Sequence, residues 1–65
     1  MTASELRAYA SFNASLALTH LRMCDRMDRG AAREACHRLA QQYVQAAKQA
    51  LARARMVDEI MGVPA

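Results

Sequence analysis

Residues 31–61 read AAREACHRLAQQYVQAAKQALARARMVDEIM, and within them alanine recurs every seven residues, at Ala40, Ala47 and Ala54. Positions seven apart lie on one stripe of an α-helix, because seven residues make nearly two turns. A stripe of alanines lets a second backbone come unusually close. The stretch therefore predicts a long helix that packs tightly against another helix.

A matching row of small residues lies in the first half of the chain, at Ala3, Ala10, Ala17 and Cys24. If the chain folds back near Arg29, this row arrives within one residue of the alanine row in the second half. Two rows that were found independently thus fall into register. This agreement favours an antiparallel α-hairpin over one continuous helix, because short turns join antiparallel neighbours.

The composition is typical of helix throughout. The chain has 65 residues, among them fifteen alanines, two glycines and one proline. Alanine loses no side-chain entropy when it enters a helix. A chain of this size buries only about 60% of the surface that its unfolded form exposes, and such small scaffolds usually need a disulfide, a metal or oligomerisation. We therefore expect one all-α domain, residues 1–65, that is marginally stable as a monomer.

Local signals mark the helix boundaries. Thr2 and Glu5 have the spacing of a capping box, which starts a helix. Gly30 is suited to close the first helix in the left-handed conformation, and either Asp28 or Gly30 suits the start of the second. Gly62, before Val63 and Pro64, is suited to end it. The expected elements are a helix over about 3–28, a turn at 28–30 and a helix over 31–61.

The first helix is amphipathic. Its expected inward side carries Leu6, Tyr9, Ala10, Phe12, Leu16, Ala17, Met23, Cys24 and Met27. Apolar flanks remain beside the main stripes, at Leu18 and Leu21 on the first helix and at Val44 and Leu51 on the second. Because two helices can cover only one face of each other, these flanks predict a further contact surface. We expect a homodimer that forms a four-helix bundle, with a monomer docked on a different protein as the alternative.

A contact surface for a larger protein is the first functional expectation. Its candidate residues are Leu18, Leu21, Val44, Leu51, Met56, Gln45 and Gln49. Methionine adapts to varied partner surfaces, and Met56 lies on a Gln- and Arg-rich face where nothing in the hairpin requires an apolar residue. A solvated helix face is the alternative there. We expect a small adaptor, chaperone or regulator of a bacterial or phage protein that acts through helix–helix contacts.

Binding of nucleic acid is the second expectation. The arginines that crowd the turn are Arg22, Arg26, Arg29 and Arg33. The net charge of +3 permits a nucleic-acid partner without requiring one, and interleaved carboxylates leave a solvated charged tip as the alternative. In shape, a dimerising hairpin with an alanine seam resembles the Rop family of plasmid regulators. That resemblance implies a homodimer that binds structured RNA or DNA through its arginine-rich turn, but it carries no residue across.

Thiol or metal binding is the third expectation. His20 and Cys24 are four apart on one face, where an ion shared with Cys36 is conceivable. No fourth ligand is evident, because His37 points about 100° away from Cys36 on the helix, and the sequence has no Cys-x-x-Cys pair. Buried reduced thiols and a disulfide across the hairpin are the other interpretations of the two cysteines. No metal or cofactor is therefore expected.

The sequence does not predict an enzyme. It has no glycine-rich phosphate loop, no inward pair of carboxylates and no Ser, His and Asp set that two helices could enclose. It also has no signal-peptide pattern, and no apolar run approaches the ~20 residues that span a bilayer. We expect a cytoplasmic, non-catalytic protein without a membrane partner.

Overall fold

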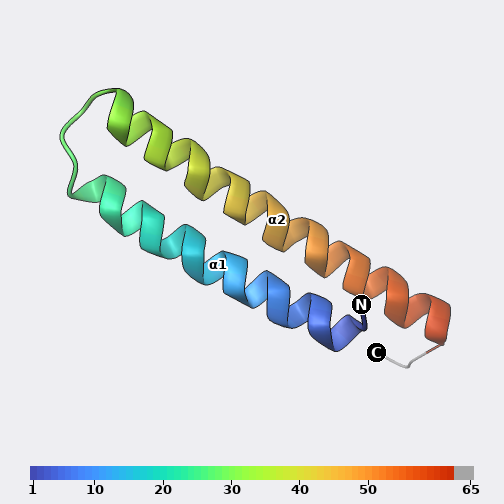
Figure 1. Cartoon of the computed structure of the whole chain (residues 1–65). Coiled ribbons are helices and arrows are strands. Elements are labelled where there is room, and N and C mark those ends of the chain that lie inside the picture. The colour runs from blue at the N-terminus through green and yellow to red at the C-terminus, as the bar shows by residue number, and fades with distance from the viewer. Residues whose placement is uncertain (63–65) are drawn as a thin grey trace.

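The computed structural model describes residues 1–62 of the chain, which form two α-helices. Helix α1 covers Ala3–Asp25 and helix α2 covers Ala31–Met61. The helices run antiparallel and lie along each other as a narrow rod with the turn at one end (Figure 1). The expected all-α hairpin is thereby confirmed, and no strand occurs among the described residues.

The two rows of small residues meet in the seam between the helices. Every member of the α2 row is buried, and the α1 row is buried except for Ala3, which is half-buried at the helix start. Because an alanine side chain ends at Cβ, helices packed through alanines approach the lower end of the usual ~8–10 Å range of interaxial distances. The seven-residue repeat therefore sets how closely the two helices pack.

The core holds few large side chains. Leu6 is the one large aliphatic residue that is buried within residues 1–62, with 2% of its surface exposed, and it clusters with Ala10, Ala47, Ala50 and Ala54. Alanine contributes little apolar area per residue. The hairpin alone therefore buries little apolar surface, and most of its large hydrophobic side chains stay at the surface.

The expected inward position of three α1 residues is wrong. Tyr9, Phe12 and Met23 are exposed by 46%, 62% and 49%. At 100° per residue Tyr9 lies about 70° from the centre of the buried stripe, and Phe12 lies about 130° from it, on the solvent side. A closely packed alanine seam covers only a narrow strip of each helix, so side chains beside that strip remain in solvent.

The capping box at the start of α1 is confirmed. The backbone N–H of Glu5 donates to Thr2 Oγ1 at 3.1 Å, and the backbone N–H of Thr2 donates to Glu5 Oε1 at 3.1 Å. These hydrogen bonds from Thr2 favour the ionised carboxylate and lower the pKa of Glu5. At the other end of the chain Gly62 closes α2 in the left-handed conformation, as expected, with φ 68°. Val63 and Pro64 lie outside the described residues.

The turn differs from its sequence-based description. Helix α1 ends at Asp25, three residues before the expected end, and its last turn tightens as the N–H groups of Arg26 and Met27 donate to carbonyls three residues back. Gly30 does not close α1. It is the residue before α2, where its φ of 150° suits glycine. Residues 26–30 form a turn and bends that carry the chain from the axis of α1 to that of α2.

Candidate binding surfaces

An apolar groove runs along one side of the seam and encloses about 300 Å³. Its lining residues are Ala14, Ala17, Leu18, Leu21, Val44, Ala47, Lys48 and Leu51. The buried alanines Ala17 and Ala47 form the floor, whereas Leu18 and Leu51 are exposed by 49% and 42% and form part of the walls. The four flank residues that the sequence analysis singled out therefore lie together on one surface.

The groove arises from the same spacing in both helices. Helix α1 contributes positions 14, 17, 18 and 21, and helix α2 contributes positions 44, 47, 48 and 51. Both sets follow the i, i+3, i+4, i+7 pattern of one helix face. The first and last positions of each set are seven steps apart, about 10 Å along the axis, which is two turns of a helix. The only charged group in the lining is the side chain of Lys48, which the sequence analysis did not include.

Three of the predicted contact residues do not join the groove. Gln45 lines a shallow surface on the outer side of α2, and Gln49 lies beside Tyr9 on the other side of the seam. Met56 is 58% exposed next to Val57. Their positions follow from the helical period, because Gln49 and Met56 are seven apart on a stripe that faces away from the groove.

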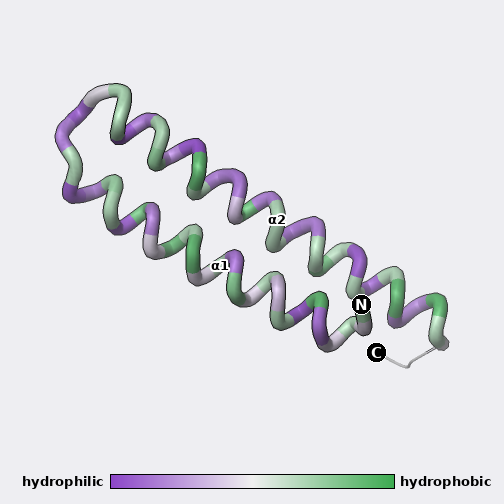
Figure 2. The backbone as a smooth tube through the Cα atoms, in the orientation of Figure 1, coloured by the Kyte–Doolittle hydropathy of each residue, from purple (hydrophilic) through white to green (hydrophobic). Residues whose placement is uncertain are grey.

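Four further large side chains are exposed, Tyr9, Phe12 and Met23 of α1 and Leu39 of α2; we call them the aromatic flank. The helical period puts Tyr9, Met23 and Leu39 on the side of the seam away from the groove, and Phe12 on the outer face of α1. Figure 2 shows hydrophobic residues alternating with hydrophilic ones along both helices. The hairpin thus exposes apolar side chains on both sides of its seam, where each side is available to a partner.

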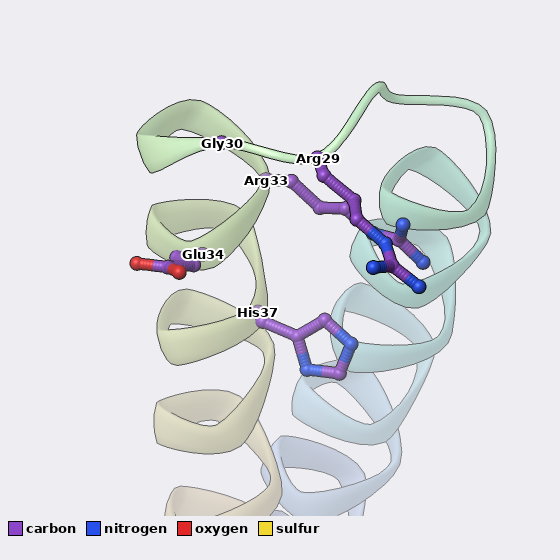
Figure 3. A pocket seen from close by; sticks show the side chains of 5 residues that line it. All are labelled: Arg29, Gly30, Arg33, Glu34 and His37. Atoms are coloured by element: carbon purple, nitrogen blue, oxygen red, sulfur yellow. The ribbon is translucent and has the colours of Figure 1, made fainter.

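A basic hollow of about 360 Å³ lies at the turn end and is lined by Arg29, Gly30, Arg33, Glu34 and His37. Figure 3 shows the side chains of Arg29, Arg33 and His37 extending to the same side, toward α1, while the Glu34 carboxylate points away from them. The hollow combines two of the predicted arginines with His37, which the sequence analysis had considered only as a metal ligand. Arg22 and Arg26 do not line it.

These turn arginines have no carboxylate partner in residues 1–62. The single ion pair in that part of the chain joins Arg7 to Asp58 at the opposite end of the rod, where the Arg7 guanidinium donates to Asp58 Oδ2. The acidic residues interleaved along the turn sequence therefore do not neutralise the arginines by direct contact. Their guanidinium groups keep hydrogen-bond donors for a ligand.

The two cysteines approach each other across the seam near the turn. The Cys24 thiol is buried and donates to the carbonyl of Arg33 over 3.9 Å, and the Cys36 thiol donates to the carbonyl of His20 over 3.3 Å. Burial, followed by interaction with the Cys36 thiol, raises the pKa of the Cys24 thiol. Both thiols are free in the structure.

His20 is not arranged with the cysteines as a metal site. Its Nδ1 donates to the Leu16 carbonyl at 2.8 Å, and its ring packs against Tyr43 with 5.2 Å between the centroids. Because a carbonyl can only accept, this bond fixes the proton on Nδ1 in the neutral ring. Over residues 1–62, no three side chains of His, Cys, Asp or Glu gather in a way that could hold an ion.

Comparisons with family models, with curated proteins and with solved structures found no match to this chain. Neither described helix combines the length and the hydropathy that crossing a bilayer requires. Any functional conclusion therefore depends on the groove, the aromatic flank, the basic hollow and the thiols themselves.

Proposed function

We propose that this protein is a non-catalytic adaptor or regulator that binds an amphipathic helix of another protein in the groove between α1 and α2. The observation that carries the proposal is the gathering of Leu18, Leu21, Val44 and Leu51, contributed equally by both helices, over an alanine floor. A third helix can fill a groove between two helices that lie side by side, because its row of apolar side chains packs into the groove.

The lining also indicates the chemistry of the partner. Small floor residues leave room for one row of medium-sized apolar side chains spaced over two helical turns. Lys48 places an ammonium group at the edge, so a helix with a carboxylate beside its apolar row would complement it. The expected occupant is therefore an amphipathic helix with an acidic residue flanking its apolar stripe.

The small core supports pairing of two copies as part of the same proposal. One buried leucine and six buried alanines leave a 65-residue chain with little apolar burial of its own. The aromatic flank includes residues of both helices, and its Tyr9 and Phe12 are large exposed side chains that a second copy of the chain could bury. We assign the dimer contact of a four-helix bundle to this flank, which leaves the groove open to the partner.

The experiment uses charge substitutions on each surface. Leu18→Glu and Leu51→Glu each place a carboxylate in the groove, and Phe12→Glu places one on the aromatic flank, all at exposed positions. The tagged protein is used to capture its partner from a lysate of the host cell, at low and at moderate salt and with nuclease present. Mass spectrometry then identifies the partner, and cross-linking identifies the residues in contact. Sedimentation equilibrium of each purified variant measures the oligomeric state.

The expected result separates the two surfaces. The groove variants should lose the cross-linked partner by at least about tenfold, because a carboxylate at the apolar contact must be desolvated when the partner binds, and they should remain dimeric. Phe12→Glu should shift the sedimentation profile toward the monomer. Equal partner recovery by wild type and both groove variants would refute the groove as the binding site.

A second candidate function is nucleic-acid binding through the basic hollow. The specific observation in its favour is that Arg29, Arg33 and His37 extend to one side without an ion-pair partner in the described part of the chain. Guanidinium groups suit phosphate oxygens. For RNA titrated at several salt concentrations, the double variant Arg29→Gln/Arg33→Gln should flatten the slope of log K against log salt by about 2 if both residues contact phosphate. An unchanged slope would remove this function, and Leu18→Glu serves as the control.

A further inference from the structure

Each cysteine reaches the other helix at the level of the other cysteine. The Cys24 sulfur contacts the carbonyl of Arg33, and the Cys36 sulfur contacts the carbonyl of His20. A helical carbonyl points along the axis toward the next turn, three to four positions later. The Arg33 carbonyl therefore projects toward the turn that holds Cys36, and the His20 carbonyl projects toward the turn that holds Cys24. The two thiols thus occupy the same layer of the seam, one from each side.

The spacing of the helices suits a covalent bond at this layer. For two helices ~8 Å apart with Cα atoms at a radius of ~2.3 Å, Cα atoms that face each other directly are ~3.4 Å apart, and Cα atoms turned to either side of that line reach the ~4.4–6.8 Å that a disulfide requires. Cys24 is itself a member of the small-residue row that faces α2. No larger side chain would have to move aside for the sulfurs to join.

The two thiols differ in access. Cys24 is fully buried, whereas Cys36 is only half-buried. A small disulfide reagent in solution can therefore reach the Cys36 sulfur first. Cys24 is then placed to attack from inside the seam, which is the arrangement of an entry thiol and a resolving thiol.

We propose that Cys24 and Cys36 form a reversible intramolecular disulfide by exchange with a low-molecular-weight disulfide such as oxidised glutathione, and that this bond ties α1 to α2 at the turn end. The Cys36 thiolate attacks one glutathione sulfur, the glutathione S–S bond breaks, and one glutathione leaves as a thiolate. Cys24 loses its proton to water and attacks the Cys36 sulfur of the mixed disulfide, which releases the second glutathione. Two protein thiols are oxidised and one glutathione disulfide is reduced to two thiols.

The test incubates the purified full chain in glutathione buffers of graded redox ratio, then blocks free thiols and measures intact mass and thiol count. Wild type should lose both thiols together as a single chain, with two hydrogens fewer and no bound glutathione. Cys24→Ala extends the alanine row, so it should keep the fold and accumulate glutathione on Cys36. Cys36→Ala should stay largely unmodified, because its remaining thiol is buried.

Thermal unfolding gives an independent readout. A bond that closes the loop from residue 24 to residue 36 should raise Tm by about 10 °C or more relative to the reduced protein, and the shift should be absent in both single variants. Disulfides that link two chains, stable glutathione on both cysteines, or thiols that survive fully oxidising buffer would each overturn the proposal. A Tm that falls on oxidation would also overturn it, since a bond between two thiols in one layer of the seam should constrain the unfolded chain and leave the fold intact.

Discussion

Replacing Leu6 by alanine tests whether the core of the hairpin is as small as described. Leu6 is 2% exposed and packs among alanines that cannot lengthen to fill the space. The substitution removes three carbon groups at ~0.8 kcal/mol each, about 2.4 kcal/mol, and a residual cavity raises the cost to about 3 kcal/mol. A chain of this length has a total stability of roughly 3–10 kcal/mol. Leu6→Ala should therefore lower Tm by roughly 15 °C.

Leu18→Ala is the matched control, because it makes the same chemical change in the same helix at a side chain that is 49% exposed. We expect it to cost about 1 kcal/mol or less. Urea denaturation followed by circular dichroism measures both variants, at equal protein concentration because a dimer would make stability concentration-dependent. Equal losses for the two variants would show that Leu6 is not the centre of the core.

Three further outcomes are expected. Thr2→Ala removes the N-cap and should lower the free energy of unfolding by about 1 kcal/mol in urea titrations, and an unchanged midpoint would contradict the capping role. Because the pKa of Glu5 is lowered in the folded state, its ionised carboxylate stabilises the fold at pH values above the ordinary pKa of 4.5. This stabilisation is lost as the pH falls through the lower pKa of the folded state. The stability difference between wild type and Glu5→Gln should therefore shrink in acid, and a difference that grows there would have the wrong sign. Ala54→Leu should destabilise the hairpin by about 1–3 kcal/mol by forcing the helices apart, whereas the same change at exposed Ala52 should be nearly neutral.

The seam between the helices could be predicted from the sequence, because alanines at seven-residue intervals fall on one face of a helix. The same periodicity brought Leu18, Leu21, Val44 and Leu51 to one flank, and the structure places them in one groove. A helical wheel gives the direction of a side chain but not the distance between two helices. It could not show that the close seam leaves Tyr9 and Met23 exposed.

The remaining features depend on the turn and on long-range contacts. The end of α1 at Asp25 follows from the path that the chain takes between the axes, which no local signal specifies. Arg33 and His37 are four apart on α2 and share one face by the helical period, whereas the approach of Arg29 to them depends on that path. The Arg7–Asp58 ion pair joins residues at opposite ends of the chain, so only the folded hairpin brings it together.

A seam built from one repeated small residue could form in more than one alignment of the two helices. Moving α2 along α1 by seven residues, about 10.5 Å, would again set alanine against small side chains along much of the contact. The seam itself discriminates weakly between these positions. The connection between the helices has five residues, 26–30. A hairpin shifted by seven residues in one direction would need a connection seven residues longer, and one shifted in the other direction would have no residues left for a connection. The length of the connection therefore selects the alignment of the helices together with the few register-specific contacts, such as that of Leu6, and an insertion of seven residues there would remove the constraint that the connection imposes.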